Sequence, residues 1–252
     1  MNRSISNNKR RITMYVATAV AVLILAGPLA SEGRGSFELW DDAQFTVNSY
    51  QNSGMLYDES CATIVSGGSV DYIRASGTST VNVSGGSVLS LDAYYSSTVN
   101  VSAGSVSFVD AYHSSTVDIS AGSVSRIDAY DESSTVNISG GSVGSVIAHD
   151  ASTVDISGGS VSSLYAYDDS AVDIHGYDFR TTAGLTLDGD NVLGTGVLTG
   201  KWYGQDDTMW AMTISTNAAA ATIRVVPEPA TLSLLALGGL AMLRRRRRWE
   251  FK

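Results

Sequence analysis

The sequence predicts an all-β fold whose main element is a parallel β-helix, or solenoid. The first reason is an internal repeat: residues 66–174 hold six copies of one unit, five of 18 residues and one of 19. The second is the alternation of apolar and polar residues inside each copy, which has the two-residue period of β-strands. The third is a pair of Gly- or Ser-rich corners in every copy. A unit this short cannot bury its own apolar face, so we expect stacked copies with one coil per repeat.

The second copy shows the packing that we expect in each coil. Its apolar residues, among them Leu91, Ala93 and Val99, fall on one face of the alternating pattern, and its polar residues fall on the other. Val99 should then lie between Val81 and Val117 of the neighbouring copies. A continuous inner column of aliphatic side chains follows from this stacking.

The consensus of the repeat is S-G/A-G-S-V-x-x-aliphatic-x-A-Y-x-x-S-T-V-N/D-V/I, and the repeat region resembles adhesin-like parallel β-solenoids. We expect about six coils with a rise of about 4.8 Å per coil. A right-handed coil is favoured, because aliphatic residues do not recur at every sixth position as they do in the left-handed hexapeptide helix. The fourth copy carries its extra residue near Glu132. The copies begin at Ser66, Ser84, Ser102, Ser120, Ser139 and Ser157.

Less regular strands are expected on both sides of the repeats. Residues 31–65 should form an N-terminal cap, which includes Phe37–Val47, and a degenerate first coil. Residues 175–225 should form a C-terminal β cap, because short apolar stretches continue there after the consensus is lost. These C-terminal strands should cover the open end of the solenoid, since an uncovered coil edge invites association.

Residues 1–30 have the pattern of a secretory signal peptide with a helical apolar core. Four basic residues precede a largely apolar run over 12–26, and small residues follow up to Ala30. The apolar run is shorter than the roughly 20 residues that a membrane-spanning helix needs. An uncleaved membrane anchor is the alternative, but the pattern favours a leader that is removed on export.

Residues 226–252 carry a second targeting pattern. A Pro-Glu-Pro motif precedes an apolar stretch over 230–243, which suits a short transmembrane helix, and five arginines follow. This order of motif, helix and arginine cluster resembles the PEP-CTERM sorting signal. The residues that carry the resemblance are Val226, Pro227, Glu228, Pro229, Arg244, Arg245, Arg246, Arg247 and Arg248.

The resemblance implies a destination and a set of partners. Proteins with this signal are exported by biofilm-forming bacteria of the Gram-negative type. They are held transiently in the inner membrane by the C-terminal helix and are processed near the motif by an exosortase-like protease. The expected location is therefore the cell envelope, the cell surface or the extracellular matrix. The expected partners are the exosortase and the export machinery, with exopolysaccharide as an open alternative.

The exported part is strongly acidic although both ends of the chain are basic. Residues 31–226 contain 23 Asp and Glu against 6 Lys and Arg, a net charge of about −17. Such a charge excludes nucleic acid as a partner, because it repels phosphate groups. Cys61 is the only cysteine, so no internal disulfide can form. We expect a small buried residue there, with an intermolecular bridge as the alternative. A zinc site of Cys and His ligands is excluded for the same lack of ligands.

Stacking places residues of one consensus position in an outward row along the solenoid. One such row contains Asp92, Asp110 and Asp128. Adjacent carboxylates about 4.8 Å apart repel by roughly 1 kcal/mol in water, so either solvent screens them or calcium binds between them. The calcium-binding repeat G-G-x-G-x-D is absent, which favours a solvated row.

A second row contains Tyr94, Tyr112, Tyr130 and Tyr167, with His149 at the same position of the fifth copy. Aromatic rings beside carboxylates can form a platform for sugar rings, so this row is a candidate glycan-binding ladder. The alternative, which we favour, is that stacking of like side chains stabilises the sheet.

A third row repeats Thr-x-Asn or Thr-x-Asp, from Thr80-x-Asn82 to Thr153-x-Asp155. Flat rows of hydroxyl residues suggest an ice-binding surface. The Asp members interrupt the uncharged regularity of such a surface, and ladders of hydroxyl and amide groups explain the row adequately.

These features predict a non-catalytic protein without a cofactor. The repeats lack the long loops and convergent charged groups of polysaccharide-degrading solenoid enzymes, and the three histidines occupy three different repeat positions. We expect a structural or adhesive role at the surface or in the matrix. The alternatives are a polysaccharide- or calcium-binding module, a polysaccharide-degrading enzyme and, last, an ice-binding protein.

Overall fold

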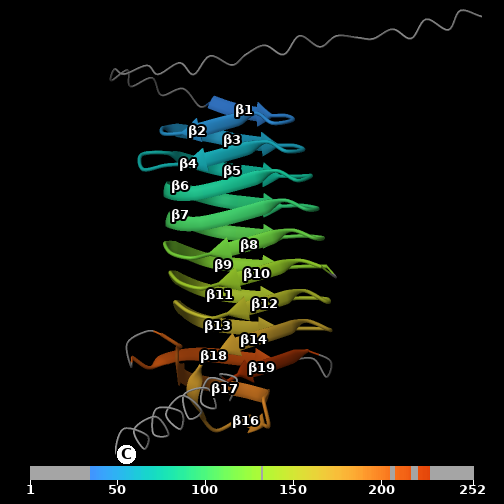
Figure 1. Cartoon of the computed structure of the whole chain (residues 1–252), viewed down its shortest axis with the longest axis vertical. Helices are drawn as coiled ribbons and strands as arrows, with labels where there is room; N and C mark the ends of the chain where they lie inside the picture. The colour runs from blue at the N-terminus through green and yellow to red at the C-terminus, as the bar shows by residue number, and fades with distance from the viewer. Residues whose placement is uncertain (1–34, 132, 205–207, 217–220, 228–252) are drawn as a thin grey trace, which may run out of the picture. The chain divides into compact units, whose positions relative to one another are not determined.

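The computed structural model describes residues 35–131, 133–204, 208–216 and 221–227. These residues form an all-β parallel solenoid of about eight turns with a spacing of about 18 residues (Figure 1), which confirms the predicted fold class. The described residues form strands and turns and no helix, so none of them makes a helix that could cross a membrane. The helices predicted for the leader and the sorting tail lie outside these ranges. The right-handed sense of the coil stays a prediction.

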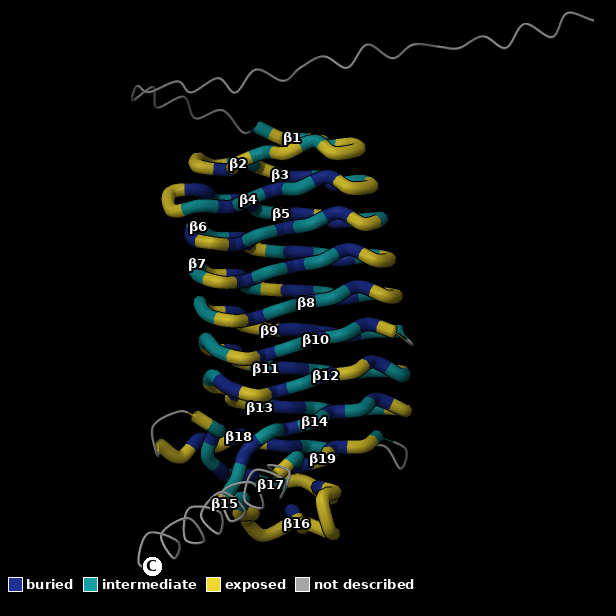
Figure 2. The backbone as a smooth tube through the Cα atoms, in the orientation of Figure 1, coloured by how far each residue is buried: buried dark blue, intermediate teal, exposed yellow. Residues whose placement is uncertain are grey.

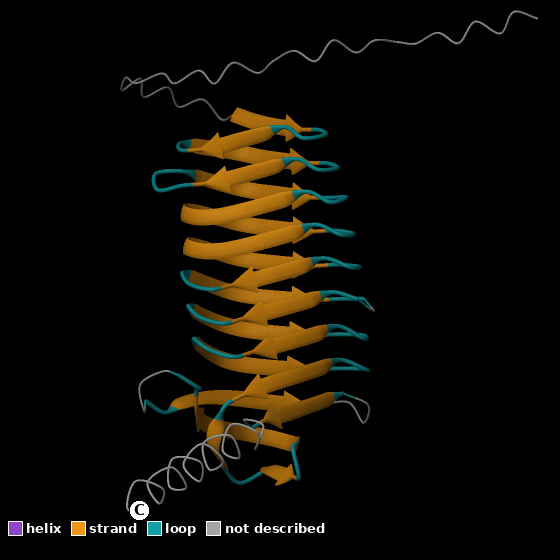
Figure 3. Ribbon diagram, viewed as in Figure 1, coloured by secondary structure: helices purple, strands orange, loops and turns teal. Residues whose placement is uncertain are grey.

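Each turn contributes one strand to each of two parallel ladders, with corners between them (Figure 3). We name the first ladder the threonine sheet, after its outward threonines. Its strands are β2 (Gln44–Val47), β4 (Cys61–Ile64), the first part of β6 (Thr80–Ala93) and of β7 (Thr98–Ala111), β8 (Thr116–Ile119), β10 (Thr135–Ile138), β12 (Thr153–Ile156), β14 (Ala171–His175) and β19 (Thr222–Val226).

We name the second ladder the aspartate sheet, after its outward aspartates. Its strands are β1 (Gly35–Leu39), β3 (Tyr50–Leu56), β5 (Ser69–Ala75), the second part of β6 and of β7, β9 (Ser123–Ala129), β11 (Ser142–Ala148), β13 (Ser160–Ala166) and β18 (Trp210–Thr216).

The inner faces of the two sheets bury one continuous aliphatic core. Val99 pairs with Val81 on one side and with Val117 on the other, and all three are 0% exposed. Buried and more accessible residues alternate along the repeat strands of the threonine sheet, such as β8 and β10 (Figure 2). The predicted inner column is confirmed. Each fully buried side chain of this kind contributes about 1.5–3 kcal/mol, so the core of stacked coils supplies the stability that one repeat lacks.

The extra residue of the fourth copy is absorbed in a turn. Ala129 pairs with Ala148 at an offset of 19 residues, whereas Ala111 pairs with Ala129 at an offset of 18. Thr135 pairs in register with the consensus threonines on both sides. The insertion therefore falls between Ala129 and Thr135, as predicted, and leaves both sheets undisturbed.

The two corners of each coil turn by different means. Before the aspartate sheet, Gly122 has a φ of 81°, and a Cβ there would lie 2.9 Å from backbone atoms of the preceding coil. Before the threonine sheet, one coil has a left-handed glycine, Gly77, and the following coils have other residues in this conformation. Tyr95, His113 and Asp131 have φ values of 60°, 57° and 70° at equivalent positions. Left-handed backbone is unusual for Tyr and His, so the neighbouring coils must hold these corners in place.

The N-terminal segment forms a regular coil. β1 pairs in parallel with β3, and β2 pairs in parallel with β4. Gly54 leaves room for the ring of Phe37, which lies 4.8 Å from the ring of Phe45. Residues that we expected to cap the solenoid thus extend its two sheets, because they keep the two-residue alternation even though they lack the consensus.

The C-terminal segment first leaves the solenoid and then returns to it. β15 (Tyr177–Thr181), β16 (Leu185–Asp188) and β17 (Asn191–Lys201) form an antiparallel arrangement. β18 then pairs in parallel with β13, and β19 pairs in parallel with β14. β17 lies antiparallel along β18 and reaches β19 at Asn191. The segment after residue 175 therefore adds a further coil and covers the outer edge of its β18 strand (Figure 1).

Candidate functional site

The predicted tyrosine row is a stack of aromatic rings at the corner between the two sheets. Ring centroids lie 4.7 Å apart for Tyr94 and Tyr112, and 5.0 Å apart for Tyr112 and Tyr130. His149 continues the stack, 4.8 Å from Tyr130 and 5.1 Å from Tyr167. This spacing follows from the separation of hydrogen-bonded strands.

Stacking covers the faces of the inner rings. Tyr112, Tyr130 and His149 each have a nearly parallel ring on both sides, so a sugar could reach their edges but not their faces. Burial raises the pKa of Tyr112 above its ordinary value, and the carboxylate of Asp110 adds to the effect. The structure thus brings the predicted tyrosines together, in a geometry that favours contact of ring with ring.

The predicted aspartate row is also present, and two of its carboxylates are held by neighbours. Arg126 donates two hydrogen bonds to Asp128, with N···O distances of 2.6 and 2.9 Å. Asp128 is only 5% exposed, so this pair is well shielded on the aspartate side. Tyr72 donates a hydrogen bond of 2.6 Å to Asp92. Tyr72 and Arg126 both occupy the consensus position that lies two residues before the aspartate of a coil, on the same face of the sheet.

Asp110 lies between the other two aspartates of the row. Burial, followed by the negative charges of Asp128 and Asp92, raises the pKa of Asp110 to about 6, and Arg126 partly opposes the shift. The middle carboxyl group is therefore protonated over part of the physiological pH range.

The calcium site considered at Asp92, Asp110 and Asp128 has no geometric support. In the ranges that the structure describes, no three His, Cys, Asp or Glu side chains are grouped to hold a metal ion. Arg126 and Tyr72 already bind two of the three carboxylates. Calcium binding there stays a prediction.

The outward face of the threonine sheet carries a ladder of amide and carboxylate groups. Asn100 donates a hydrogen bond of 2.9 Å to Asn82, and Asn137 donates one of 2.7 Å to Asp118. The Asp members that interrupt an uncharged surface are therefore hydrogen-bond acceptors within the ladder.

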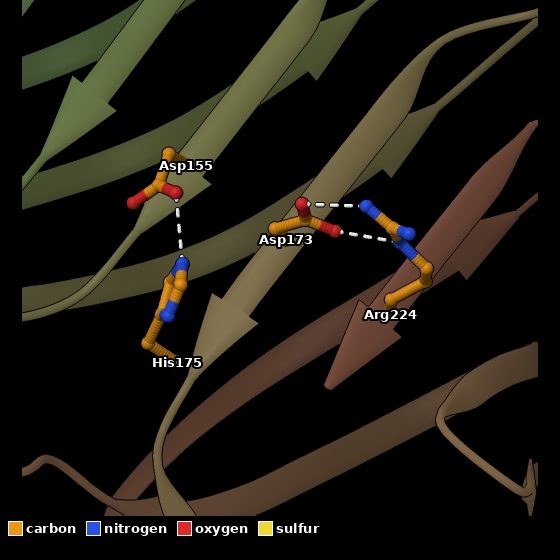
Figure 4. Close-up of polar contacts among 4 residues, drawn as sticks. All are labelled: Asp155, Asp173, His175 and Arg224. Atoms are coloured by element: carbon orange, nitrogen blue, oxygen red, sulfur yellow. Dashed lines mark hydrogen bonds and ion pairs between the residues drawn. The ribbon is translucent and has the colours of Figure 1, made fainter. Parts of the chain in front are cut away.

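Two further side chains, those of His175 and Arg224, complete the ladder at its C-terminal end (Figure 4). His175 Nε2 lies 2.8 Å from a carboxylate oxygen of Asp155. Arg224 of β19 donates two hydrogen bonds, of 2.8 and 2.7 Å, to Asp173 of β14. Neither pair was predicted from the sequence, because His175 and Arg224 lie outside the repeats.

The expectation that Cys61 is buried in the core is wrong. Cys61 is partly exposed and pairs with Thr80, in the outward threonine column. The alternation of β4 explains this position, since Ala62 and Ile64 take the inward places. Asn82 donates a hydrogen bond of 3.4 Å to the Cys61 sulfur.

A further polar row follows the left-handed residues at the corner before the threonine sheet. Asp131 accepts a hydrogen bond of 3.0 Å from the backbone N–H of His113, and Asp150 accepts one of 3.3 Å from that of Asp131. The ring of His113 stacks on that of Tyr95 at 4.8 Å. These residues occupy a variable position of the consensus, so the sequence offered no signal for them.

The C-terminal end of the solenoid contains a cavity of about 610 Å³, lined in part by Gly159, Trp202 and Trp210. The two indole rings stack at 4.6 Å, and Trp202 Nε1 donates a hydrogen bond of 2.7 Å to the carbonyl of Gly159. Trp210 Nε1 is buried and has no acceptor among the described residues. Because that nitrogen is sealed from solvent, a ligand in the cavity could not reach it without a rearrangement.

The sorting motif begins where the last strand ends. Val225 of β19 is 5% exposed, and Pro227 directly follows the strand and is exposed. The remaining predicted motif residues, 228–229 and 244–248, lie outside the described ranges.

Residues 225–248 match the family model of the PEP-CTERM protein-sorting motif. This match confirms the sorting signal that the sequence predicted. The chain is accordingly an exported protein, sorted to the cell surface and processed by an exosortase-type system. No curated protein and no solved structure matches the chain.

Proposed function

We propose that the exported part of the chain is a non-catalytic structural or adhesive element of the cell surface or the extracellular matrix. The observation that carries the proposal is that the outward rows of the repeats bind to themselves along the solenoid. Tyrosine rings stack on one another, amides donate to the next amide or carboxylate, and Arg126 binds Asp128. Rows whose rings and polar groups contact one another in this way stabilise a rigid rod.

The charge of the exported part supports the same role. Its 23 acidic residues against 6 basic ones keep it hydrated and prevent non-specific binding to anionic polymers and membranes. The attachment that the proposal requires is supplied by sorting at residues 225–248.

The proposal is tested by expressing the full chain, and a variant that lacks residues 227–252, in a host with a working exosortase. Surface and matrix fractions are measured by immunoblotting, and attachment of the cells to a solid support is measured in parallel. We expect the variant to be absent from the surface fraction. We also expect attachment of the cells to decrease. Unchanged attachment would contradict the adhesive role, and release of sugars from acidic polysaccharides by the purified protein would contradict the non-catalytic one.

A second candidate is polysaccharide binding along the tyrosine row. It is supported by the continuous array of rings from Tyr94 to Tyr167, which repeats every 4.7–5.1 Å. Since the ring faces are covered, the hydroxyl groups at the ring edges would have to make the contacts.

The matched pair Tyr112→Phe and Tyr112→Ala separates this candidate from simple stacking. Phenylalanine keeps the ring and removes the hydroxyl, whereas alanine removes both. A glycan array read with each variant, with and without calcium, measures binding. Loss of a reproducible signal in Tyr112→Phe would support recognition through the hydroxyl groups, and an array without signal for the wild type would refute this candidate.

A further inference from the structure

The two ends of the solenoid differ in how their edges are covered. At the C-terminal end, β17 lies antiparallel along the outer edge of β18 and contacts β19 through Asn191 and Arg224. At the N-terminal end, β1 pairs only with β3, and β2 pairs only with β4, within the part of the chain that the structure describes. Figure 1 shows β1 and β2 at the end opposite to β16 and β17.

The open end exposes backbone groups that can pair with another strand. In a parallel ladder, both backbone groups of one residue point to the same neighbour, and those of the next residue point to the other side. Leu39 and Val47 accept hydrogen bonds from the following coil, at Tyr57 and Val65. The alternate residues of β1 and β2 therefore direct their N–H and C=O groups away from the solenoid. They are Ser36, Glu38, Gln44 and Thr46.

The same end carries apolar side chains that are less covered than the core. Phe37, Leu39 and Phe45 pack against the core but are only partly buried. Trp40, which lies between β1 and β2, is 52% exposed. An unpaired edge combined with exposed aromatic side chains is typical of an interface between chains.

We propose that the exported chain forms a head-to-head homodimer through the open edges of β1 and β2. A head-to-tail polymer is disfavoured, because β17 already covers the edge of β18 at the other end. A two-fold axis perpendicular to the solenoid brings two N-terminal ends together with each edge strand antiparallel to the strand that it meets, and it leaves no further edge open. The chain already closes its C-terminal end with such an antiparallel strand.

Removal of the predicted leader leaves too few residues before β1 to cover the edges. If the leader ends at Ala30, only residues 31–34 precede β1, whereas a covering coil requires about 18 residues. This step rests on the export that underlies the proposed function.

The size and charge of the edge determine how tightly the dimer forms. A face that is two strands wide lies near the lower limit of specific interfaces, so we expect a dissociation constant in the micromolar range. Glu38, Asp41 and Asp42 place acidic groups near the contact. Their mutual repulsion should make association tighter as salt is added.

Sedimentation velocity on the exported, processed protein tests the proposal, from about 1 to about 100 μM. The matched variants are Thr46→Pro, which removes an N–H from the open edge, and Thr46→Ala, which keeps it. Neither substitution removes a β2–β4 hydrogen bond. We expect a monomer–dimer equilibrium for the wild type and Thr46→Ala, and at least ~10-fold weaker association for Thr46→Pro.

Three results would overturn the proposal: a monomer over the whole range, unlimited growth beyond a dimer, or equal association of Thr46→Pro. If Thr46→Pro fails to fold, hydrogen exchange of the wild type decides instead. Slower exchange of the Glu38 and Thr46 amides at high protein concentration supports the edge contact, and unchanged exchange refutes it. Neither measurement depends on surface display, so this inference and the proposed function can fail separately.

Discussion

Arg224 and Asp173 form a two-bond ion pair that attaches the final strand of the solenoid to the repeats. The two residues are 51 positions apart in the chain but lie on the adjacent strands β19 and β14, in register with each other. The antiparallel excursion of β15 to β17 separates them in sequence. Their pairing therefore fixes the place at which the chain returns to the parallel ladder.

Replacing Arg224 with alanine should loosen β19 without unfolding the repeats. Because the guanidinium is half exposed, we expect a loss of only about 0.5–1 kcal/mol in the free energy of unfolding. Hydrogen exchange should become faster for β19 amides and remain unchanged for β8 and β10. Arg180→Ala is the matched control, since its pair with Asp178 lies within β15. If the β19 amides exchange equally slowly in Arg224→Ala and Arg180→Ala, Arg224 does not hold β19 in place.

Replacing Asp110 with asparagine should stabilise the protein at neutral pH. The pKa of Asp110 is raised to about 6, above the value of about 4 in an unfolded chain, so ionisation opposes folding. Its contribution to stability is complete below pH ~4 and is lost as the pH rises through ~6.

We expect Asp110→Asn to be more stable than the wild type by about 1 kcal/mol at pH 8, after allowance for solvent screening, and the difference to vanish near pH 4. Denaturant unfolding at several pH values measures it. The control is Asp188→Asn on exposed β16, where the removed charge lies outside the aspartate row. A difference in stability between Asp110→Asn and the wild type that does not change with pH would contradict the raised pKa of Asp110.

Replacing Gly122 with alanine should destabilise the solenoid by about 2–4 kcal/mol. The φ of 81° disfavours any residue with a Cβ, and that atom would meet the backbone of the preceding coil. Ala121→Gly is the adjacent control, because other copies have glycine at its position. Thermal unfolding should show a large loss for Gly122→Ala and a small change for Ala121→Gly. Similar stability of the two variants would show that the corner can relax.

Processing should leave β19 in the mature protein. Its residues are paired with β14, and Val225 is buried, so peptide bonds within the strand are protected, whereas Pro227 is exposed. We expect mass spectrometry of the processed protein to find a C-terminus at or beyond residue 226. A mature chain that ends before Thr222 would mean that the final strand is removed during sorting.

The repeated part of the fold follows from local sequence alone. Every coil uses the same pattern, so the alternation around Val99 determines which side chains point inward, and the repeat length determines which residues stack. The same reasoning located the insertion after Ala129 and brought Asp92, Asp110 and Asp128 into one row. Periodicity is sufficient here because each coil contacts only its neighbours.

The partners of those rows depend on residues that do not repeat. Arg126 occurs in one copy only and neutralises Asp128, and the raised pKa of Asp110 results from burial and from the charges on either side of it. Whether a tyrosine row exposes ring faces or ring edges depends on side-chain rotation, which the consensus does not encode. The sequence therefore predicts which residues form each row, but not the contacts and the pKa values of those residues.

The sequence by itself determined the solenoid, the inward and outward residues of its repeats and the sorting signal, because these are encoded by short-range patterns. Only the tertiary structure decided how the solenoid ends. It extends the sheets to β1 and β2, whose outer edges have no partner among the described residues, and it returns β18 and β19 to the ladders, where Arg224 contacts Asp173. Contacts between residues so far apart in the chain carry no periodic signal, since each is made only once.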